Sequence, residues 1–221
     1  MAKKVGVVLS GCGVFDGSEI HEAVLTLYFL DKKGAEVLIM APDMNQMHVV
    51  NHLTGKPSEG EVRNVLVESA RIARGKIKDI KDVSVDDIDA LVFPGGFGAA
   101  KNLTTFAASG ANCDINKDVK RLVKEVVANK KPLVAICIAP VLVAKALEGT
   151  GIKTSLTIGN DEGVSGAIKT MGAEHITCPV KESVVDKNNK IITTPAYMLG
   201  QSISEVASGI EKTIDELYKL F

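Results

Sequence analysis

Apolar residues occur along this chain in two alternating patterns. Short unbroken apolar runs are typical of strands buried on both faces, and longer segments with apolar residues three or four positions apart are typical of helices. The runs predict strands at 5–9, 35–40, 90–94, 132–136 and 153–158, and more weakly at 75–80. The helical spacing predicts helices from about 16 to 33 and at 61–74, 101–108, 117–130, 139–147 and 162–171, with a long C-terminal helix from about 201.

This alternation also predicts how the strands are arranged. Right-handed crossovers through helices make successive strands parallel. Residues 183–193 are an exception, because an Asn-Asn turn between two apolar stretches predicts an antiparallel hairpin there. The fold class we predict is α/β, a three-layer sandwich with a mostly parallel, flavodoxin-like central sheet. With 221 residues, we expect one domain over 1–221, with an elaboration at about 43–82 that is irregular and rich in turns.

The segment that carries the best candidate chemistry is 132–142. Cys137 lies between the predicted strand 132–136 and the helix 139–147, and Pro140 fits the first turn of that helix. The free amides and dipole of the helix N-terminus would favour the thiolate over the thiol. A lone cysteine is more often a small buried side chain. The strand–Cys–helix context instead predicts a nucleophile elbow with sulfur in place of the serine oxygen.

Two other segments are expected to meet Cys137. Glu22 heads a helical stripe with Leu25 and Phe29, so we expect its carboxylate to be half-buried near the end of the first strand. Gly95 and Gly96 follow the strand at 90–94, and amides in such glycine loops can bind a developing negative charge. Catalytic groups gather beyond the carboxyl ends of strands in sheets of this kind. A capping box of Asp16 and Glu19 is predicted to begin the helix that carries Glu22.

Composition, charge and the length of the apolar runs argue against several classes of function. The formal net charge is −1 with no long basic run, which argues against a nucleic-acid surface. Apolar runs fall far short of the roughly 20 residues of a membrane span, and the N-terminal run is too short for a signal peptide. The four cysteines form no CxxC pair, so reduced thiols and a cytoplasmic location are expected. No metal-ligand spacing is present, and we expect neither a metal nor another cofactor.

The histidines are secondary candidates. His21 neighbours Glu22 but points about 100° away around the helix, so a direct role is less expected than a structural one. His52 lies on the irregular segment and could reach the site. His175 is expected to pack locally.

Taken together, these motifs resemble the ThiJ/PfpI superfamily, within the class I glutamine-amidotransferase-like fold. More closely they resemble its ElbB branch, the enhancing-lycopene-biosynthesis or isoprenoid-biosynthesis glyoxalase proteins. The resemblance covers nearly the whole chain. The matching stretches are DGSEIHEA (16–23), VNHLTG (50–55), FPGGFGAAKNL (93–103), CIAP (137–140), GAEH (172–175) and TTPAYM (193–198).

The resemblance implies roles for individual residues. Cys137 matches the reactive elbow cysteine, and Glu22 matches the carboxylate that hydrogen-bonds it. Gly95, Gly96 and the amide of Ile138 match the oxyanion-binding positions. Hydrolase members often carry a histidine directly after the cysteine, where this chain has Ile138. Glyoxalase-like members often carry one after a short strand, where this chain runs 154–158, and true glutaminases have His-Pro-Glu where it has 194–196. A protease or glutaminase triad is therefore not expected.

Two function classes remain open. The first is a slow, cofactor-free and glutathione-independent glyoxalase III-like lyase that converts methylglyoxal or glyoxal to a 2-hydroxy acid through a Cys137 hemithioacetal. The second is a redox-responsive or regulatory protein that uses the Cys137 thiolate as an oxidation sensor. The resemblance also implies a homodimer. We expect the apolar, turn-rich segment 43–82 to lie near the interface and to wall the Cys137 pocket. Expected partners are thus a small aldehyde and a second copy, with no nucleic acid or membrane.

Overall fold

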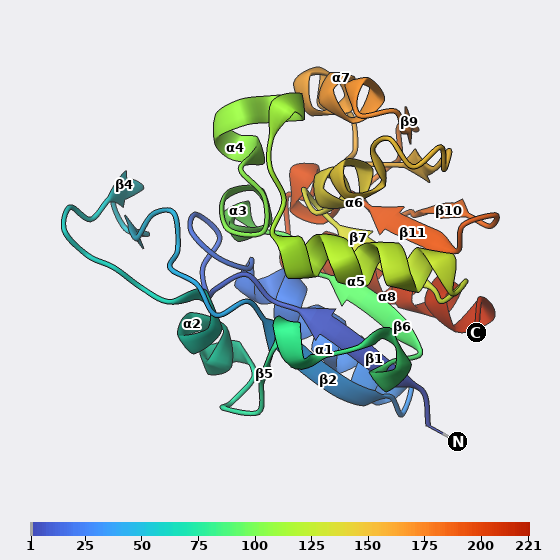
Figure 1. Ribbon diagram of the computed structural model, residues 1–221, viewed down its shortest axis with the longest axis horizontal. Helices are drawn as coiled ribbons and strands as arrows, with labels where there is room; N and C mark the ends of the chain where they lie inside the picture. The colour runs from blue at the N-terminus through green and yellow to red at the C-terminus, as the bar shows by residue number, and fades with distance from the viewer. Residues whose placement is uncertain (1) are drawn as a thin grey trace.

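A single seven-stranded sheet forms the centre of the protein, for which we describe a computed structural model covering residues 2–221 (Figure 1). The strand order is β10-β11-β7-β6-β1-β2-β5. All neighbouring pairs are parallel except β10 and β11, which form the expected antiparallel hairpin. The strands are β1 (Lys4–Val8), β2 (Glu36–Ala41), β5 (Lys78–Asp79), β6 (Ala90–Phe93), β7 (Leu133–Ile136), β10 (Val184–Asp186) and β11 (Ile191–Thr194).

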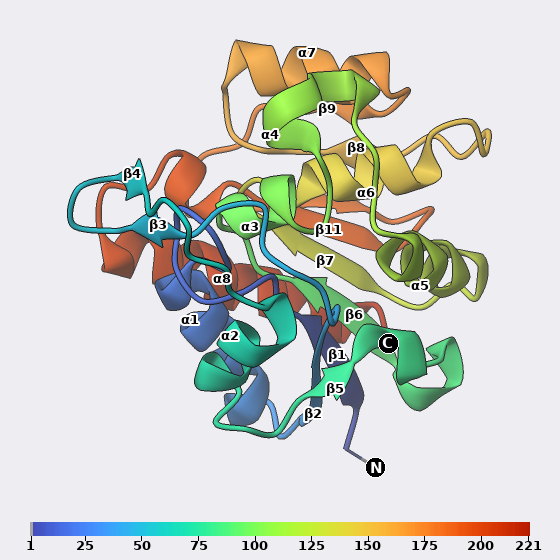
Figure 2. The ribbon, with the colours of Figure 1, turned by 60° about the vertical axis from the view of Figure 1, so that its left-hand side comes forward.

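Helices cover both faces of this sheet (Figures 1 and 2). One face packs against α1 (Ile20–Lys32), α2 (Val65–Ile72) and α8 (Ile203–Lys219). The other packs against α5 (Lys117–Ala128), α6 (Pro140–Leu147) and α7 (Glu162–Thr170), with the short helices α3 (Phe97–Lys101) and α4 (Phe106–Ser109) beside them. Single turns of 3₁₀-helix lie at Ile80–Asp82, Val85–Asp87, Gly110–Asn112 and Ala196–Met198. This arrangement confirms the predicted fold class.

The sheet is held by two apolar cores, one on each face. Along β6, Leu91 and Phe93 point into the core with α5 and α6, whereas Ala90 and Val92 point into the core with α1 and α8. All four are fully excluded from solvent. Burying a side chain the size of valine, leucine or phenylalanine contributes about 1.5–3 kcal/mol. This two-sided burial is why the central strands are unbroken apolar runs.

Two details of the sequence interpretation are wrong for physical reasons. The helix predicted at 101–108 does not form as one helix, since α3 ends at Lys101 and α4 begins at Phe106. Asn102 is the C-cap of α3, and its side-chain amide donates hydrogen bonds of 2.8 Å each to the carbonyls of Ser10 and Asp16. The capping box at Asp16 is absent, since Asp16 instead accepts a 2.7 Å hydrogen bond from the Val50 amide. Glu19 is the N-cap of α1, and its carboxylate accepts from the Glu22 amide at 2.7 Å.

The segment 43–82 is an elaboration at one edge of the sheet. It contains the small hairpin β3 (Val50–Asn51) and β4 (Lys56–Pro57), then α2, and ends in the edge strand β5. The hairpin projects from the body of the protein (Figures 1 and 2). A second small sheet pairs β8 (Ser155–Leu156) with β9 (Glu174–His175). Within residues 2–221, no helix has the length and apolar character needed to cross a membrane.

Candidate active site

Cys137 occupies a strained turn between β7 and α6. Its φ angle is +62°, a left-handed conformation that non-glycine residues rarely adopt. The turn is fixed at both ends, because the Cys137 amide donates to the Thr194 carbonyl at 2.9 Å and Pro140 is the first residue of α6. Strain of this kind persists only where the surrounding structure enforces it, and it clusters at functional sites. The predicted strand–Cys–helix turn is therefore present.

Glu22 lies beside this turn and is fully buried, more so than the half-burial expected from the sequence. It lies in the first turn of α1, and this end of the helix meets the loop that follows the carboxyl end of β6. One carboxylate oxygen, Oε2, accepts a hydrogen bond from the Gly95 amide at 3.0 Å. The other, Oε1, accepts one from the Tyr197 amide at 3.1 Å. The carboxyl group thus has a fixed position against the Cys137 thiol.

Burial controls the ionisation of both groups. It raises the pKa of Glu22 from 4.5 to about 8, helped by the charge of Glu19 and opposed by hydrogen bonds from the Tyr197 amide, the Cys137 thiol and the Gly95 amide. Burial also raises the pKa of Cys137 well above its usual value, and the charge and hydrogen bond of Glu22 act in the same direction. Amide hydrogen bonds from Gly96 and Ile138 oppose this rise without overcoming it. The expectation of a thiol pKa lowered by helix amides is therefore wrong.

The glycine loop after β6 is needed for close packing of the pair. A Cβ atom on Gly95 would overlap both Cys137 and the Glu22 carboxylate. Gly96 has φ +98° and is packed against the backbone of 17–19, so a side chain there is excluded twice. The Gly95 amide is used by Glu22, which differs from the oxyanion role expected for it. The amides that hydrogen-bond Cys137 are those of Gly96 and Ile138.

A cavity of about 380 Å³ opens onto Cys137. Its walls are mainly apolar and come from the loop at Val14, from α3 and α4, from Ile138 and from α7. Its polar side chains are those of Glu19, Asp161 and Tyr197. Asp161 and Tyr197 are not among the site residues predicted from the sequence, and Glu19 is predicted only as part of a capping box. Two features of the sequence could have pointed to them. Asp161 is the N-cap of α7, and Tyr197 lies in the stretch 193–198 that matches the superfamily.

Neither candidate histidine lines this cavity. His21 lies one step away, with its Nδ1 atom 2.7 Å from the hydroxyl of Tyr197. His52 is held in the β3–β4 hairpin, where its Nδ1 donates to the Val50 carbonyl at 3.0 Å and its Nε2 accepts from the Phe15 amide at 3.2 Å. The segment 43–82 was expected to form part of the wall of this cavity. Within a single chain this expectation is wrong, because no residue of 43–82 lines the cavity.

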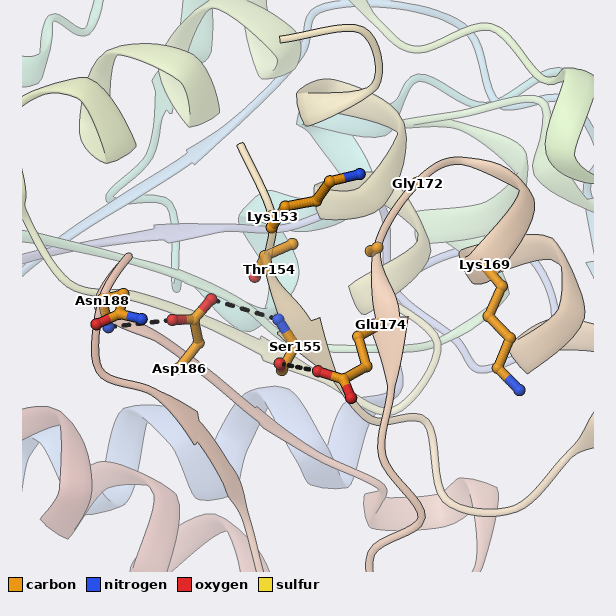
Figure 3. Close-up of a pocket in the computed structure, with 9 residues that line it drawn as sticks. Lys153, Thr154, Ser155, Lys169, Gly172, Glu174, Asp186 and Asn188 are labelled. Carbon is orange, nitrogen blue, oxygen red and sulfur yellow. Dashed lines mark hydrogen bonds between the residues drawn. The ribbon is translucent and has the colours of Figure 1, made fainter. Parts of the chain in front are cut away.

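A second hollow, of about 490 Å³, lies between β8, β9 and β10 (Figure 3). Several of its polar groups, those of Asp186, Ser155, Asn188 and Glu174, are hydrogen-bonded to one another. Asp186 accepts hydrogen bonds from the amides of Ser155 and Asn188, at 3.3 and 3.1 Å, and the Ser155 hydroxyl donates to Glu174 at 2.7 Å. In the described part of the chain, no group of three or more His, Cys, Asp or Glu side chains could hold a metal ion.

Several known proteins are similar to this chain over most of its length. The chain is 49% identical to the human mitochondrial protein called glutamine amidotransferase-like class 1 domain-containing protein 3, over 99% of this chain and 84% of that one. The zebrafish mitochondrial ES1 protein is 37% identical over 88% of this chain and 76% of its own length. A crystal structure of an isoprenoid biosynthesis protein with an amidotransferase-like domain, from Ehrlichia chaffeensis, superimposes with a TM-score of 0.91. That protein is 40% identical, and the match covers 99% of this chain and 100% of the other.

The family match includes both halves of the site. The model of the DJ-1/PfpI family matches residues 12–198, a span that contains Glu22, the glycine loop, Cys137 and Tyr197. The chain therefore belongs to the DJ-1/PfpI family.

Proposed function

We propose that this protein is a cofactor-free, glyoxalase III-like lyase of the ElbB branch that converts 2-oxoaldehydes such as methylglyoxal and glyoxal to 2-hydroxy acids. The observation that carries the proposal is the buried Glu22–Cys137 pair, in which Glu22 is fully buried and Cys137 lines the 380 Å³ cavity. A carboxyl group whose pKa is about 8 can both give and take a proton near neutral pH. Tuned carboxyl groups of this kind are typical of acid–base catalysis.

The chemistry needs only these groups and water. Ionised Glu22 takes the proton of the Cys137 thiol as the sulfur adds to the aldehyde carbon. The C–S bond forms and the C=O π bond opens to an oxyanion within reach of the Gly96 and Ile138 amides, and Glu22 then gives the proton to this oxygen to complete the hemithioacetal. Glu22 next takes the proton from the former aldehyde carbon, which leaves an enediolate, and returns it to the neighbouring carbon, while the hydroxyl proton on the first carbon passes to the oxygen of the second. The first carbon is thereby oxidised to a thioester and the second reduced to an alcohol. Water then cleaves the C–S bond, which releases the 2-hydroxy acid and restores the thiol.

Turnover by metal-free protein tests the proposal. Methylglyoxal should yield lactate without glutathione, and Cys137→Ala should abolish the reaction while keeping the fold. Cys12→Ala is the matched control, because Cys12 is also a free thiol but does not line the cavity. Lactate formation by Cys137→Ala at a rate comparable to the unmodified protein would exclude the proposed nucleophile.

A redox-responsive or regulatory role is the second candidate. It is favoured by the lack of a histidine among the described residues that line the cavity. Against it, sensor cysteines have low pKa values and are accessible, whereas Cys137 is only 7% exposed. The two functions differ toward bulky oxidants. Rapid formation of a mixed disulfide with oxidised glutathione at Cys137, without turnover of any 2-oxoaldehyde, would favour the sensor.

We further propose a homodimer and a cytoplasmic location. The dimer is supported by apolar side chains exposed on the elaboration, Leu53 at 94% and Val62 at 71%. Light scattering of Leu53→Asp, with the unmodified protein beside it, would test whether this surface is an interface. The names of the human and zebrafish relatives place those proteins in mitochondria. Fractionation of cells that contain the chain would decide between the two compartments.

A further inference from the structure

We infer that the Cys137 cavity selects uncharged carbonyl compounds whose substituent is apolar and larger than methyl, and that it excludes anionic ones. The inference rests on the proposed function, because it names the substrate class of the same site. It is carried by three observations: the volume of the cavity, the apolar character of its walls, and the sign of the charges that line it.

The volume exceeds what a three-carbon dicarbonyl can fill. A non-hydrogen atom takes at most about the 30 Å³ of a water molecule in the liquid, so methylglyoxal occupies at most about 150 Å³. The cavity holds about 380 Å³, which falls within the range of about 300–1,000 Å³ typical of pockets for larger organic ligands. Methylglyoxal would leave more than half of the space to water. A substrate with a larger side group would displace that water.

The walls determine what kind of side group fits. Phe97 and Phe106 enter the cavity from α3 and α4, and Val164 and Met198 enter from the α7 side and the 3₁₀ turn after β11. Aromatic rings and flexible methionines favour contact with an apolar or aromatic surface. Apart from Tyr197 and the carboxylates of Glu19 and Asp161, these walls offer no side chain that could replace the hydrogen bonds of a polar side group. A phenyl or branched aliphatic substituent is therefore the chemistry that matches them.

The charges in the cavity are all negative. Glu19 and Asp161 are its charged side chains, and no Lys, Arg or His of the described chain lines it. Both carboxylates are fixed as helix caps. Glu19 accepts from the Glu22 amide at 2.7 Å, and Asp161 accepts from the Val164 amide at 2.8 Å. Because these hydrogen bonds hold them in place, the carboxylates cannot turn away from an incoming anion.

Two basic side chains, those of Lys101 and His21, contact residues of the cavity wall but do not line the cavity themselves. The Lys101 ammonium donates to the Phe15 carbonyl at 2.8 Å and lies 5.2 Å from the centre of the Phe97 ring. The His21 ring is 4.0 Å from the Glu19 carboxylate and bonded to the Tyr197 hydroxyl. Neither lines the space in front of the Cys137 sulfur, so neither is placed to pair directly with an anion there.

Turnover of two neutral substrates tests the size preference. Phenylglyoxal, measured as mandelate, should be converted with a kcat/KM at least about tenfold above that of methylglyoxal, measured as lactate. Ala107→Phe places a ring in the cavity at an exposed position of α4, and it should reduce this ratio at least threefold. Ala108→Phe is the control, since Ala108 is equally exposed but does not line the cavity. A ratio near one, or a ratio that Ala107→Phe leaves unchanged, would overturn the size preference.

Alkylation tests the charge preference without requiring turnover. Iodoacetamide and iodoacetate have almost the same size but differ in charge, and mass spectrometry reports their rates at Cys137. Relative to the same ratio for a cysteine peptide, iodoacetate should react at least about tenfold more slowly than iodoacetamide. Asp161→Asn keeps the helix cap and should reduce this discrimination about threefold, whereas Glu162→Gln, outside the cavity, should not.

The two kinds of failure are distinguishable. If the alkylation ratio matches that of the peptide, the charge selection is wrong even where methylglyoxal is turned over. If the discrimination is present and no 2-oxoaldehyde is turned over, the charge selection is upheld, and the proposed lyase activity and the size preference for its substrates fail.

Discussion

The Cys137 cavity and the hollow beside β10 have comparable volumes, about 380 and 490 Å³, but opposite chemistry. In the hollow, the ionised Asp186 is stabilised by its neighbours. Burial acts to raise the pKa of Asp186, but hydrogen bonds from Asn189 and the Ser155 amide outweigh it and lower that pKa. In the cavity, burial prevails, and it raises the pKa of both Glu22 and Cys137.

This difference distinguishes a structural polar cluster from a reactive one. A carboxylate with a complete set of donors has no tendency to exchange protons near neutral pH, and it stabilises the fold. When a carboxyl group is buried beside a thiol, its ionised form is destabilised and its pKa rises. Such a group can exchange a proton near neutral pH. A choice of active site by volume alone would favour the hollow over the Cys137 cavity.

The largest effect that would sharpen this comparison is the pH dependence of stability caused by Glu22. Its pKa is about 8 in the folded protein and near 4.5 when exposed, so between these values the folded state keeps a proton that the unfolded state releases. The stabilisation is complete below about pH 4.5 and is lost as the pH rises through about 8. At about 1.4 kcal/mol per pH unit, the total is at most about 5 kcal/mol.

Urea unfolding of the unmodified protein and of Glu22→Gln between pH 5 and 9 measures this loss. The difference between the two free energies of unfolding should decline as the pH rises. Two parallel curves would show that Glu22 is ionised in the folded protein, and would place it in the same class as Asp186.

The second effect concerns the hollow. Asp186→Asn replaces one acceptor oxygen with a donor, opposite the Asn189 side chain that hydrogen-bonds it at 2.7 Å. Hydrogen bonds to charged groups contribute about 1.5–3 kcal/mol each, so a loss of about 2 kcal/mol in the free energy of unfolding is expected at pH 7. Aldehyde turnover by the folded variant should be unchanged. A variant of normal stability with impaired turnover would mean that the hollow, too, takes part in the reaction.

The third effect lies in the thiol. Glu22→Gln removes both the charge and the hydrogen bond through which Glu22 raises the pKa of Cys137. The thiol pKa should therefore fall, and alkylation of Cys137 by iodoacetamide at pH 8 should become about tenfold faster. Glu19→Gln is the control, because Glu19 raises the pKa of Glu22 and its removal should not accelerate alkylation. Superimposable pH–rate curves for Glu22→Gln and the unmodified protein would argue against the pair.

The parts of the fold and of the site that could be predicted are those that follow from the pattern of buried apolar residues along the chain. The strands β6 and β7 and the helix α5 depend on apolar periodicity, which is visible in the sequence, and so they were predicted closely. Cys137 and Glu22 followed from their places at the ends of such elements. The division between α3 and α4 did not, and Asn102, the C-cap of α3, hydrogen-bonds two carbonyls that lie more than 80 positions earlier in the chain.

The direction of the thiol pKa was missed for a related reason. The sequence shows that a helix N-terminus follows Cys137, and this local effect favours the thiolate. It does not show how completely α1 and the glycine loop would exclude water, and desolvation is the larger effect. Tyr197 was missed because its contribution comes partly from a backbone amide, which residue type does not reveal.

The smallest expected effect isolates the strain at the elbow. Cys137 and Cys113 are both buried cysteines, but the φ angle is +62° at Cys137 and −67° at Cys113. A left-handed conformation costs a residue with a Cβ atom about 1–2 kcal/mol, and glycine adopts it freely. Cys137→Gly should therefore be more stable than Cys137→Ala by about 1 kcal/mol. At Cys113 the order should reverse, because glycine there only adds entropy to the unfolded chain. Since both comparisons remove the same sulfur, differential scanning calorimetry of the four variants separates strain from lost packing. The same sign at both positions would show that the elbow stores no strain.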